Sequence, residues 1–184
     1  KREDSVIFIN ADNEYLMGIL PKNVRAEYYT RDESKAGASV YGQIIACDPF
    51  LRLKWRQGDS EWHEVTTHLI GSYNLDNVLA AVTVGLHFEV TPEQICHALE
   101  NYVPSNNRSQ LTETEHNHLI VDAYNANPTS MEAALRNLAE IPAKRTFLVL
   151  GDMCELGAES YMEHQRIVRL IMDLPFNGAF LFGP

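Results

Sequence analysis

Short runs of alternating or continuous apolar side chains fill the first seventy residues, and this spacing is typical of β-strands. Turn-forming residues at Asp48-Pro49 and Gln57-Gly58-Asp59 separate the later runs. Because only these short turns divide the last three runs, they predict an antiparallel meander. The predicted strands are Val6 to Ile9, Val24 to Thr30, Ser39 to Cys47, Phe50 to Arg56 and Trp62 to Leu69.

Helical spacing replaces this pattern from Ser72 onward. Apolar residues recur every three or four positions to about Leu86, which predicts a helix. A second helix is expected to begin after Thr91, because Thr91 suits the N-cap, Pro92 the first helical position and Gln94 the third position of a capping box. That helix should end near Asn101, and Pro104 to Asn107 is typical of a linker.

The remaining residues alternate between strand and helix patterns. Helices are predicted from Pro128, with Asn127 as N-cap, and from Ala158 to about Met172. Strands are predicted at Leu119 to Tyr124, Thr146 to Leu150 and Ala179 to Phe182. This β-α-β-α-β order predicts a parallel sheet in an α/β protein, with ligands beyond the carboxyl ends of its strands.

The composition is that of a globular protein, with 45% hydrophobic and 22% charged residues among 184. A formal net charge of -10 argues against non-specific binding to nucleic acid or to an anionic membrane. Three widely spaced cysteines without a C-x-x-C pair fit a reducing compartment better than a disulfide framework. We therefore expect a cytoplasmic protein with no nucleic-acid or membrane partner.

Two asparagines near the start of the first helix form the first candidate site. Asn74 and Asn77 are three residues apart and so share one helix face. Their amides offer both donors and acceptors, which the edge of an adenine requires. Simple capping of the helix by Ser72 or Asn74 is the alternative, and spacing alone favours it because cap residues are so common.

The segment Asp122 to Pro128 is the second candidate, because it joins a strand end to a helix start. Asp122 could accept hydrogen bonds from ribose hydroxyls, as acidic residues do in dinucleotide-binding folds. Tyr124, Asn125 and Asn127 surround the free N–H groups of the helix N-terminus. The alternative is an Asx-turn followed by an N-cap.

A third segment, Gly151 to Gly157, holds Asp152 and Glu155 beside glycines, where acids could bind a metal or orient an amine. A turn whose glycines adopt positive φ is the alternative. Arg108 follows the linker and could reach a phosphate or ribose, although a solvated surface arginine is the commoner case. The chain has neither a G-x-x-x-x-G-K-[ST] loop nor a G-x-G-x-x-G motif.

Together these motifs resemble the Mur ligases, in the branch that joins D-alanyl-D-alanine to UDP-N-acetylmuramoyl-tripeptide. The resemblance rests on Gly71 to Asn77, Asn107-Arg108, Asp122 to Pro128, and Leu150 to Gly157 with His164. It extends over essentially the whole chain. It implies that residues 1–105 are the rear part of a P-loop-type central ATPase domain, and that residues 106–184 are the front part of a Rossmann-like C-terminal domain.

The resemblance also implies roles for individual residues. Asn74 and Asn77 would meet the adenine, and Arg108 and Asp122 would hold the ribose of ATP. The rest of the second segment, Tyr124, Asn125 and Asn127, would face the reaction centre. Many relatives have histidine where this chain has Tyr73, so the resemblance implies no role for an imidazole at that position.

The reaction implied is ATP-dependent amide formation through an acyl phosphate in peptidoglycan precursor synthesis, with Mg²⁺ held by residues outside this chain. The substrates would be ATP, the UDP-linked tripeptide and the dipeptide. These 184 residues alone should then be inactive. The alternatives are another ligase of the superfamily, such as folylpolyglutamate synthase or the ligase that adds the third residue, and a non-catalytic nucleotide-binding module.

Overall fold

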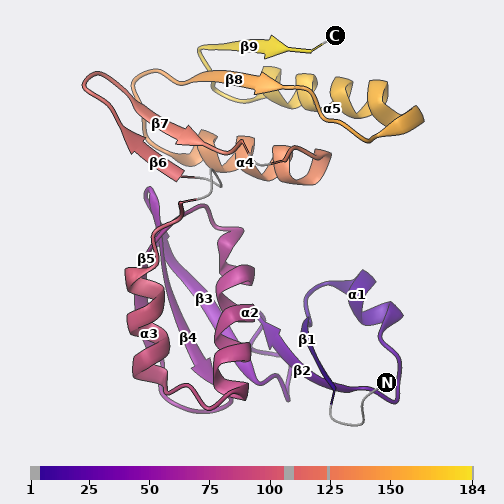
Figure 1. Cartoon of the computed structure of the whole chain (residues 1–184), viewed down its shortest axis with the longest axis vertical. Coiled ribbons are helices and arrows are strands. Elements are labelled where there is room, and N and C mark those ends of the chain that lie inside the picture. The colour runs from indigo at the N-terminus through magenta and orange to yellow at the C-terminus, as the bar shows by residue number, and fades with distance from the viewer. Residues whose placement is uncertain (1–4, 106–109, 124, 184) are drawn as a thin grey trace. The chain divides into compact units, whose positions relative to one another are not determined.

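The computed structural model describes residues 5–105, 110–123 and 125–183. The chain divides into two compact units, Lys1–Val103 and Pro104–Pro184. Both combine helices with strands, so the predicted α/β class is confirmed. Figure 1 labels the elements of both units.

Unit 1 is built on a five-stranded mixed sheet in the order β1-β2-β3-β4-β5. The strands are β1 (Val6–Asn10), β2 (Arg25–Thr30), β3 (Val40–Cys47), β4 (Phe50–Gln57) and β5 (His63–Ile70). The pairs β1–β2 and β2–β3 are parallel, whereas β3–β4 and β4–β5 are antiparallel. The predicted meander is therefore confirmed. A short helix that the sequence pattern did not predict, α1 (Glu14–Ile19), connects β1 to β2.

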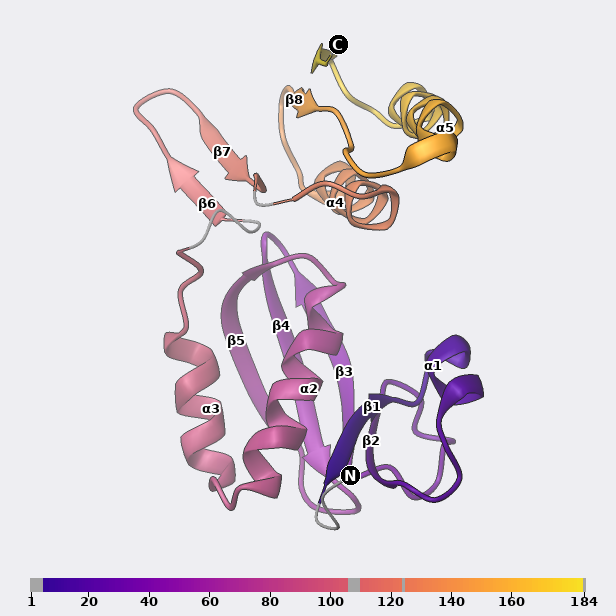
Figure 2. The same ribbon diagram turned by 45° about the vertical axis from the view of Figure 1, so that its right-hand side comes forward.

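Two helices, α2 (Asn74–His87) and α3 (Pro92–Asn101), cover one face of this sheet (Figure 2). Alternate residues of β4, namely Leu51, Leu53 and Trp55, are fully buried beneath them. Leu75, Val78, Leu79 and Val82 meet these strands from α2. The predicted capping box of α3 is confirmed, because Thr91 and Gln94 each accept a backbone N–H from the other.

Unit 2 contains the strands β6 (Gln110–Glu113), β7 (His118–Val121), β8 (Phe147–Gly151) and β9 (Gly178–Phe182). The helices are α4 (Pro128–Glu140) and α5 (Ser160–Asp173), with a 3-10 turn, η1, at Gly157–Glu159. The β-α-β-α-β order is confirmed from β7 to β9. Leu135 of α4, Leu148 of β8 and Ile167 of α5 form the centre of a separate small core.

The strand pairing in unit 2 differs from the prediction in one respect. Strands β8 and β9 are parallel, but β7 pairs in antiparallel fashion with β6 in a second two-stranded sheet. The tight connection favours this hairpin, because Thr114 and Asn117 exchange hydrogen bonds across its turn. A local partner is also cheaper in chain entropy than β8, which follows a whole helix later.

Candidate functional site

The first turn of α2 fixes the two candidate asparagines in different ways. Asn74 is only 8% exposed, and its Nδ2 donates to the carbonyl oxygen of Ile70 at 2.7 Å. Its Oδ1 accepts from Nδ2 of Asn77 at 3.0 Å. Because a carbonyl can only accept, the contact with Ile70 determines which way the Asn74 amide faces. Asn77 is exposed, so it is the member of the pair that a ligand can reach.

The capping alternative for this turn is not what the structure shows. Tyr73 occupies the N-cap position, and no side chain there accepts a backbone N–H of the first turn. Asn74 is the first helical residue, and its side chain turns back to the end of β5. Its amide therefore links strand to helix and supports Asn77.

Arg31, immediately after β2, ties the start of α2 to the sheet. Its Nε donates to Oδ1 of Asp76 at 2.7 Å, and its Nη2 donates to the carbonyl oxygen of Ser72 at 3.4 Å. Its backbone N–H donates to Oδ2 of Asp12, which follows β1, at 2.7 Å. Sequence reasoning missed this group, because Arg31 and Asp76 are 45 residues apart.

The Asp12 carboxylate accepts hydrogen bonds from several groups at the ends of β1 and β2. It accepts from the Thr30 hydroxyl at 2.6 Å and from the Lys35 ammonium at 2.9 Å. Burial raises the pKa of the Asp12 carboxyl, but these contacts and the Arg31 N–H together hold it below the usual value of 3.8. Charged and hydrogen-bonded groups thus meet at the carboxyl ends of β1 and β2.

In the segment that follows β7, Asn127 caps the next helix. Oδ1 of Asn127 accepts from the Ser130 N–H at 2.9 Å, and Oγ of Ser130 accepts from the Asn127 N–H at 3.2 Å. The N-cap prediction for Asn127 is therefore confirmed. Asp122 and Asn125 are exposed. Two of the candidates, Arg108 and Tyr124, lie outside the described residues.

The third segment lies at the carboxyl end of β8 and encloses a buried side chain. Met153 is 3% exposed and belongs to the core of unit 2. Positive φ occurs at Gly157, as expected, but the other such residue is Glu155, with φ of 64°, and not Gly151. The prediction of positive φ is thus wrong at Gly151, and the left-handed conformation occurs instead at Glu155, four residues later.

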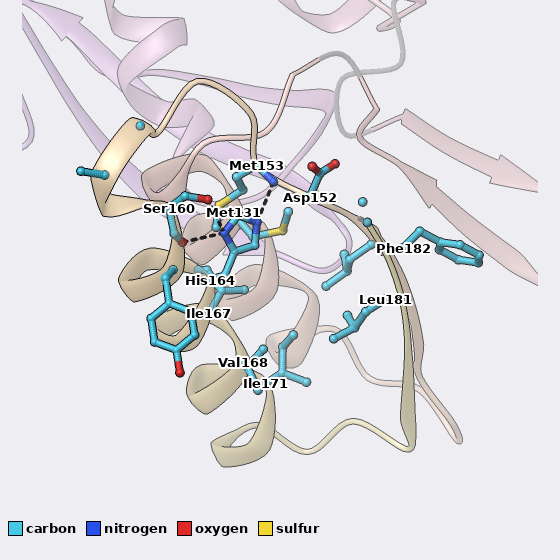
Figure 3. A pocket seen from close by; sticks show the side chains of 16 residues that line it. Met131, Asp152, Met153, Ser160, His164, Ile167, Val168, Ile171, Leu181 and Phe182 are labelled. Atoms are coloured by element: carbon cyan, nitrogen blue, oxygen red, sulfur yellow. Dashed lines mark hydrogen bonds between the residues drawn. The ribbon is translucent and has the colours of Figure 1, made fainter.

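A cavity of about 720 Å³ lies beside this segment, between α5 and the ends of β8 and β9 (Figure 3). Apolar side chains such as Ile167 and Leu181 line most of it, and Asp152, Ser160 and His164 provide polar groups. No cluster of three or more metal-binding side chains occurs among residues 5–105, 110–123 and 125–183. Nor does the described part of the chain contain a helix long and apolar enough to cross a bilayer.

The fold of the chain is that of solved Mur ligases. It superposes on the crystal structure of MurF ligase from Thermotoga maritima in complex with ADP with a TM-score of 0.83 and 19% identity, over 99% of this chain and 41% of that one. A MurF from Acinetobacter baumannii gives a TM-score of 0.82 and 24% identity, over 99% and 39%.

Sequence comparison agrees with the fold. Residues 107–183 match the family model "Mur ligase, glutamate ligase domain". The UDP-N-acetylmuramoyl-tripeptide–D-alanyl-D-alanine ligase of Mycobacterium leprae is 35% identical over 98% of this chain and 40% of its own length. The chain belongs to the Mur ligase family. It spans about two fifths of the length of this relative.

Proposed function

We propose that this chain is part of an ATP-dependent ligase that joins D-alanyl-D-alanine to UDP-N-acetylmuramoyl-tripeptide. The observation that carries the proposal is the 35% identity, over 98% of the chain, to a relative of that name. The product is a peptidoglycan precursor, and we place the reaction in the cytoplasm. The proposal includes the division of the chain into the rear of a central ATPase domain, residues 1–105, and the front of a C-terminal domain, residues 106–184.

The asparagine pair supports a nucleotide-binding role for unit 1. An amide can donate to a ring nitrogen of adenine and accept from its exocyclic amine. The exposed Asn77 would make this contact, while Asn74 would hold Asn77 in place from behind. We thus keep both residues as nucleotide-binding residues and assign direct contact to Asn77.

The remaining candidates belong to unit 2 and the linker before it. We propose that Arg108 and Asp122 bind the ribose, since a guanidinium and a carboxylate can donate to and accept from its hydroxyls. Tyr124, Asn125 and Asn127 are proposed to face the reacting groups. Asn127 would do so with its Nδ2, because its Oδ1 caps α4.

The proposed reaction activates the tripeptide carboxylate by phosphoryl transfer from ATP, after which the dipeptide amine displaces phosphate. Mg²⁺ would neutralise phosphoryl charge, and we place its ligands outside this chain. The residues of this chain would bind the nucleoside and position the amine. We therefore expect the 184 residues alone to show no ligase activity, and amide formation by the purified chain would contradict this.

The test follows phosphate release by the full-length protein with UDP-N-acetylmuramoyl-tripeptide and ATP. D-alanyl-D-alanine, D-glutamate and diaminopimelate are supplied in turn as the amine. Release with the dipeptide alone is the expected result. Release with another amine would move the protein to another branch of the superfamily. Absence of release with every amine would favour a non-catalytic nucleotide-binding module.

A matched pair of variants tests the adenine assignment. Asn77→Ala should raise the KM for ATP about tenfold, since one lost hydrogen bond in a binding site is worth about 1 to 1.5 kcal/mol. Asn101→Ala is the control, because Asn101 is an exposed asparagine at the end of α3 whose Nδ2 donates to the carbonyl oxygen of His97 in the same helix. Equal effects of the two substitutions would count against Asn77.

A further inference from the structure

His164 on α5 is held between two backbone groups of different kinds (Figure 3). Its Nδ1 lies 2.7 Å from the carbonyl oxygen of Ser160, one helical turn earlier. Its Nε2 accepts the backbone N–H of Met153 at 3.0 Å. A carbonyl oxygen only accepts and an N–H only donates, so the ring must be neutral, with its proton on Nδ1.

The segment that His164 contacts needs an external restraint. Glu155 has φ of 64°, a left-handed conformation that costs a residue with a side chain roughly 1 to 2 kcal/mol. Gly157 has φ of 55°, and residues 157–159 form only a 3-10 turn. Such a backbone persists where its surroundings fix it. The described restraints on Met153 are burial in the core of unit 2 and the bond to His164.

The segment after β8 carries the charged Asp152 at the carboxyl end of the strands, which is where parallel sheets bind ligands. Asp152 is exposed, follows β8 directly and lines the cavity together with His164. The hydrogen bond from Met153 fixes the peptide next to Asp152. A change at His164 Nε2 is therefore expected to alter the direction of the Asp152 carboxylate.

We propose that neutral His164 is a positioning residue that aims Asp152 at the ammonium group of the dipeptide. The inference rests on the proposed ligase function and adds to it an acidic subsite for the amine substrate. The pairing of a carboxylate with an ammonium group is a charge-assisted hydrogen bond, whose strength depends on geometry. The role of His164 is thus to provide a hydrogen-bond acceptor, Nε2, for the Met153 N–H.

Two substitutions separate the nitrogens of the ring. The amide nitrogen of asparagine occupies the place of Nδ1, so His164→Asn keeps the donor to Ser160 and removes the acceptor for Met153. The amide oxygen of glutamine reaches the place of Nε2, so His164→Gln keeps the acceptor. His116→Asn is the matched control, since His116 lies exposed in the turn between β6 and β7.

The full-length protein is assayed by phosphate release, with D-alanyl-D-alanine and ATP varied separately. His164→Asn should lower kcat/KM for the dipeptide by about 10- to 100-fold, since a misplacement of about 1 Å can cost that much, and should leave the KM for ATP within twofold. His164→Gln should recover most of the loss. Thermal melting of each variant shows whether it is folded.

The outcomes distinguish this inference from the function on which it rests. If the unsubstituted protein releases no phosphate with the dipeptide, the ligase proposal fails, and this inference with it. If the protein is active and the Asn and Gln variants are equally impaired, or both unimpaired, the inference alone is overturned. A parallel rise in the KM for ATP would also overturn it, because that indicates a general loss of structure.

Discussion

A methyl group added at Gly42 should loosen the sheet from the helix that carries the candidate asparagines. Gly42 lies in β3 beneath α2, and a Cβ built there would lie 2.3 Å from Cδ2 and 2.9 Å from Cδ1 of Leu79. Leu79 is fully buried, so its side chain cannot turn into solvent. Gly42→Ala therefore forces a shift of α2 or of the Leu79 rotamer.

The magnitude follows from the packing around Leu79. Overpacking of a well-filled core costs about 1 to 3 kcal/mol, and here the contact is far inside van der Waals distance. A loss of about 2 kcal/mol moves the urea midpoint by about 1 M at a slope near 2 kcal/mol/M. Leu79→Ala alone should cost about 2 to 5 kcal/mol through its cavity. In the double variant the new methyl occupies part of that cavity, so its cost should be below the sum by about 1 kcal/mol or more.

Tryptophan fluorescence during urea unfolding is the assay. Both tryptophans of the chain, Trp55 and Trp62, lie in unit 1, so the signal reports this unit alone. Gly18→Ala is the control, because a Cβ at Gly18 of α1 meets nothing within 4 Å and alanine favours a helix. An unchanged midpoint for Gly42→Ala, or additive costs in the double variant, would refute the packing argument.

Three further substitutions test single contacts. The Asp12 carboxyl has a lowered pKa, so it contributes stability above pH 3.8 that is lost as the pH falls further. Asp12→Asn should therefore make the fall in stability below that pH less steep when acid unfolding is followed by fluorescence. An unchanged steepness would contradict the assignment. Thr67→Val should lower the free energy of unfolding in urea by about 1 to 3 kcal/mol, because the buried Thr67 hydroxyl donates to the Leu51 carbonyl and accepts the Leu69 N–H. A loss below about 0.5 kcal/mol would argue against both hydrogen bonds. Asn127→Ala removes the cap of α4 and should cost unit 2 about 1 kcal/mol by circular dichroism, whereas Asn127→Ser should cost little.

Local rules predicted the elements well where neighbouring residues decide the outcome. The capping residues Thr91 and Asn127 act on backbone groups three positions away, so their roles can be read from sequence. The alternation in β4 likewise fixes which residues are buried, because side chains of a strand point to opposite faces in turn. Helix α1 escaped prediction, since six residues are too few for a clear period.

The candidate sites were predicted as segments, and the state of their side chains was not. Spacing placed Asn74 and Asn77 on one face, but it could not show that one is buried and the other exposed. The role of His164 depends on the backbone of Met153, eleven residues away across a turn. Neither fact has a signature in spacing.

The sequence by itself determined the class of fold, the order of most elements, the helix caps and the segments that resemble the Mur ligases. Each of these depends on contacts within about four residues or on a motif read directly. The tertiary structure decided that Arg31 donates a hydrogen bond to Asp76, that β7 pairs with β6, and that Nε2 of His164 accepts the Met153 N–H. Contacts between distant residues depend on how whole elements pack, and packing is a property of the folded chain as a whole.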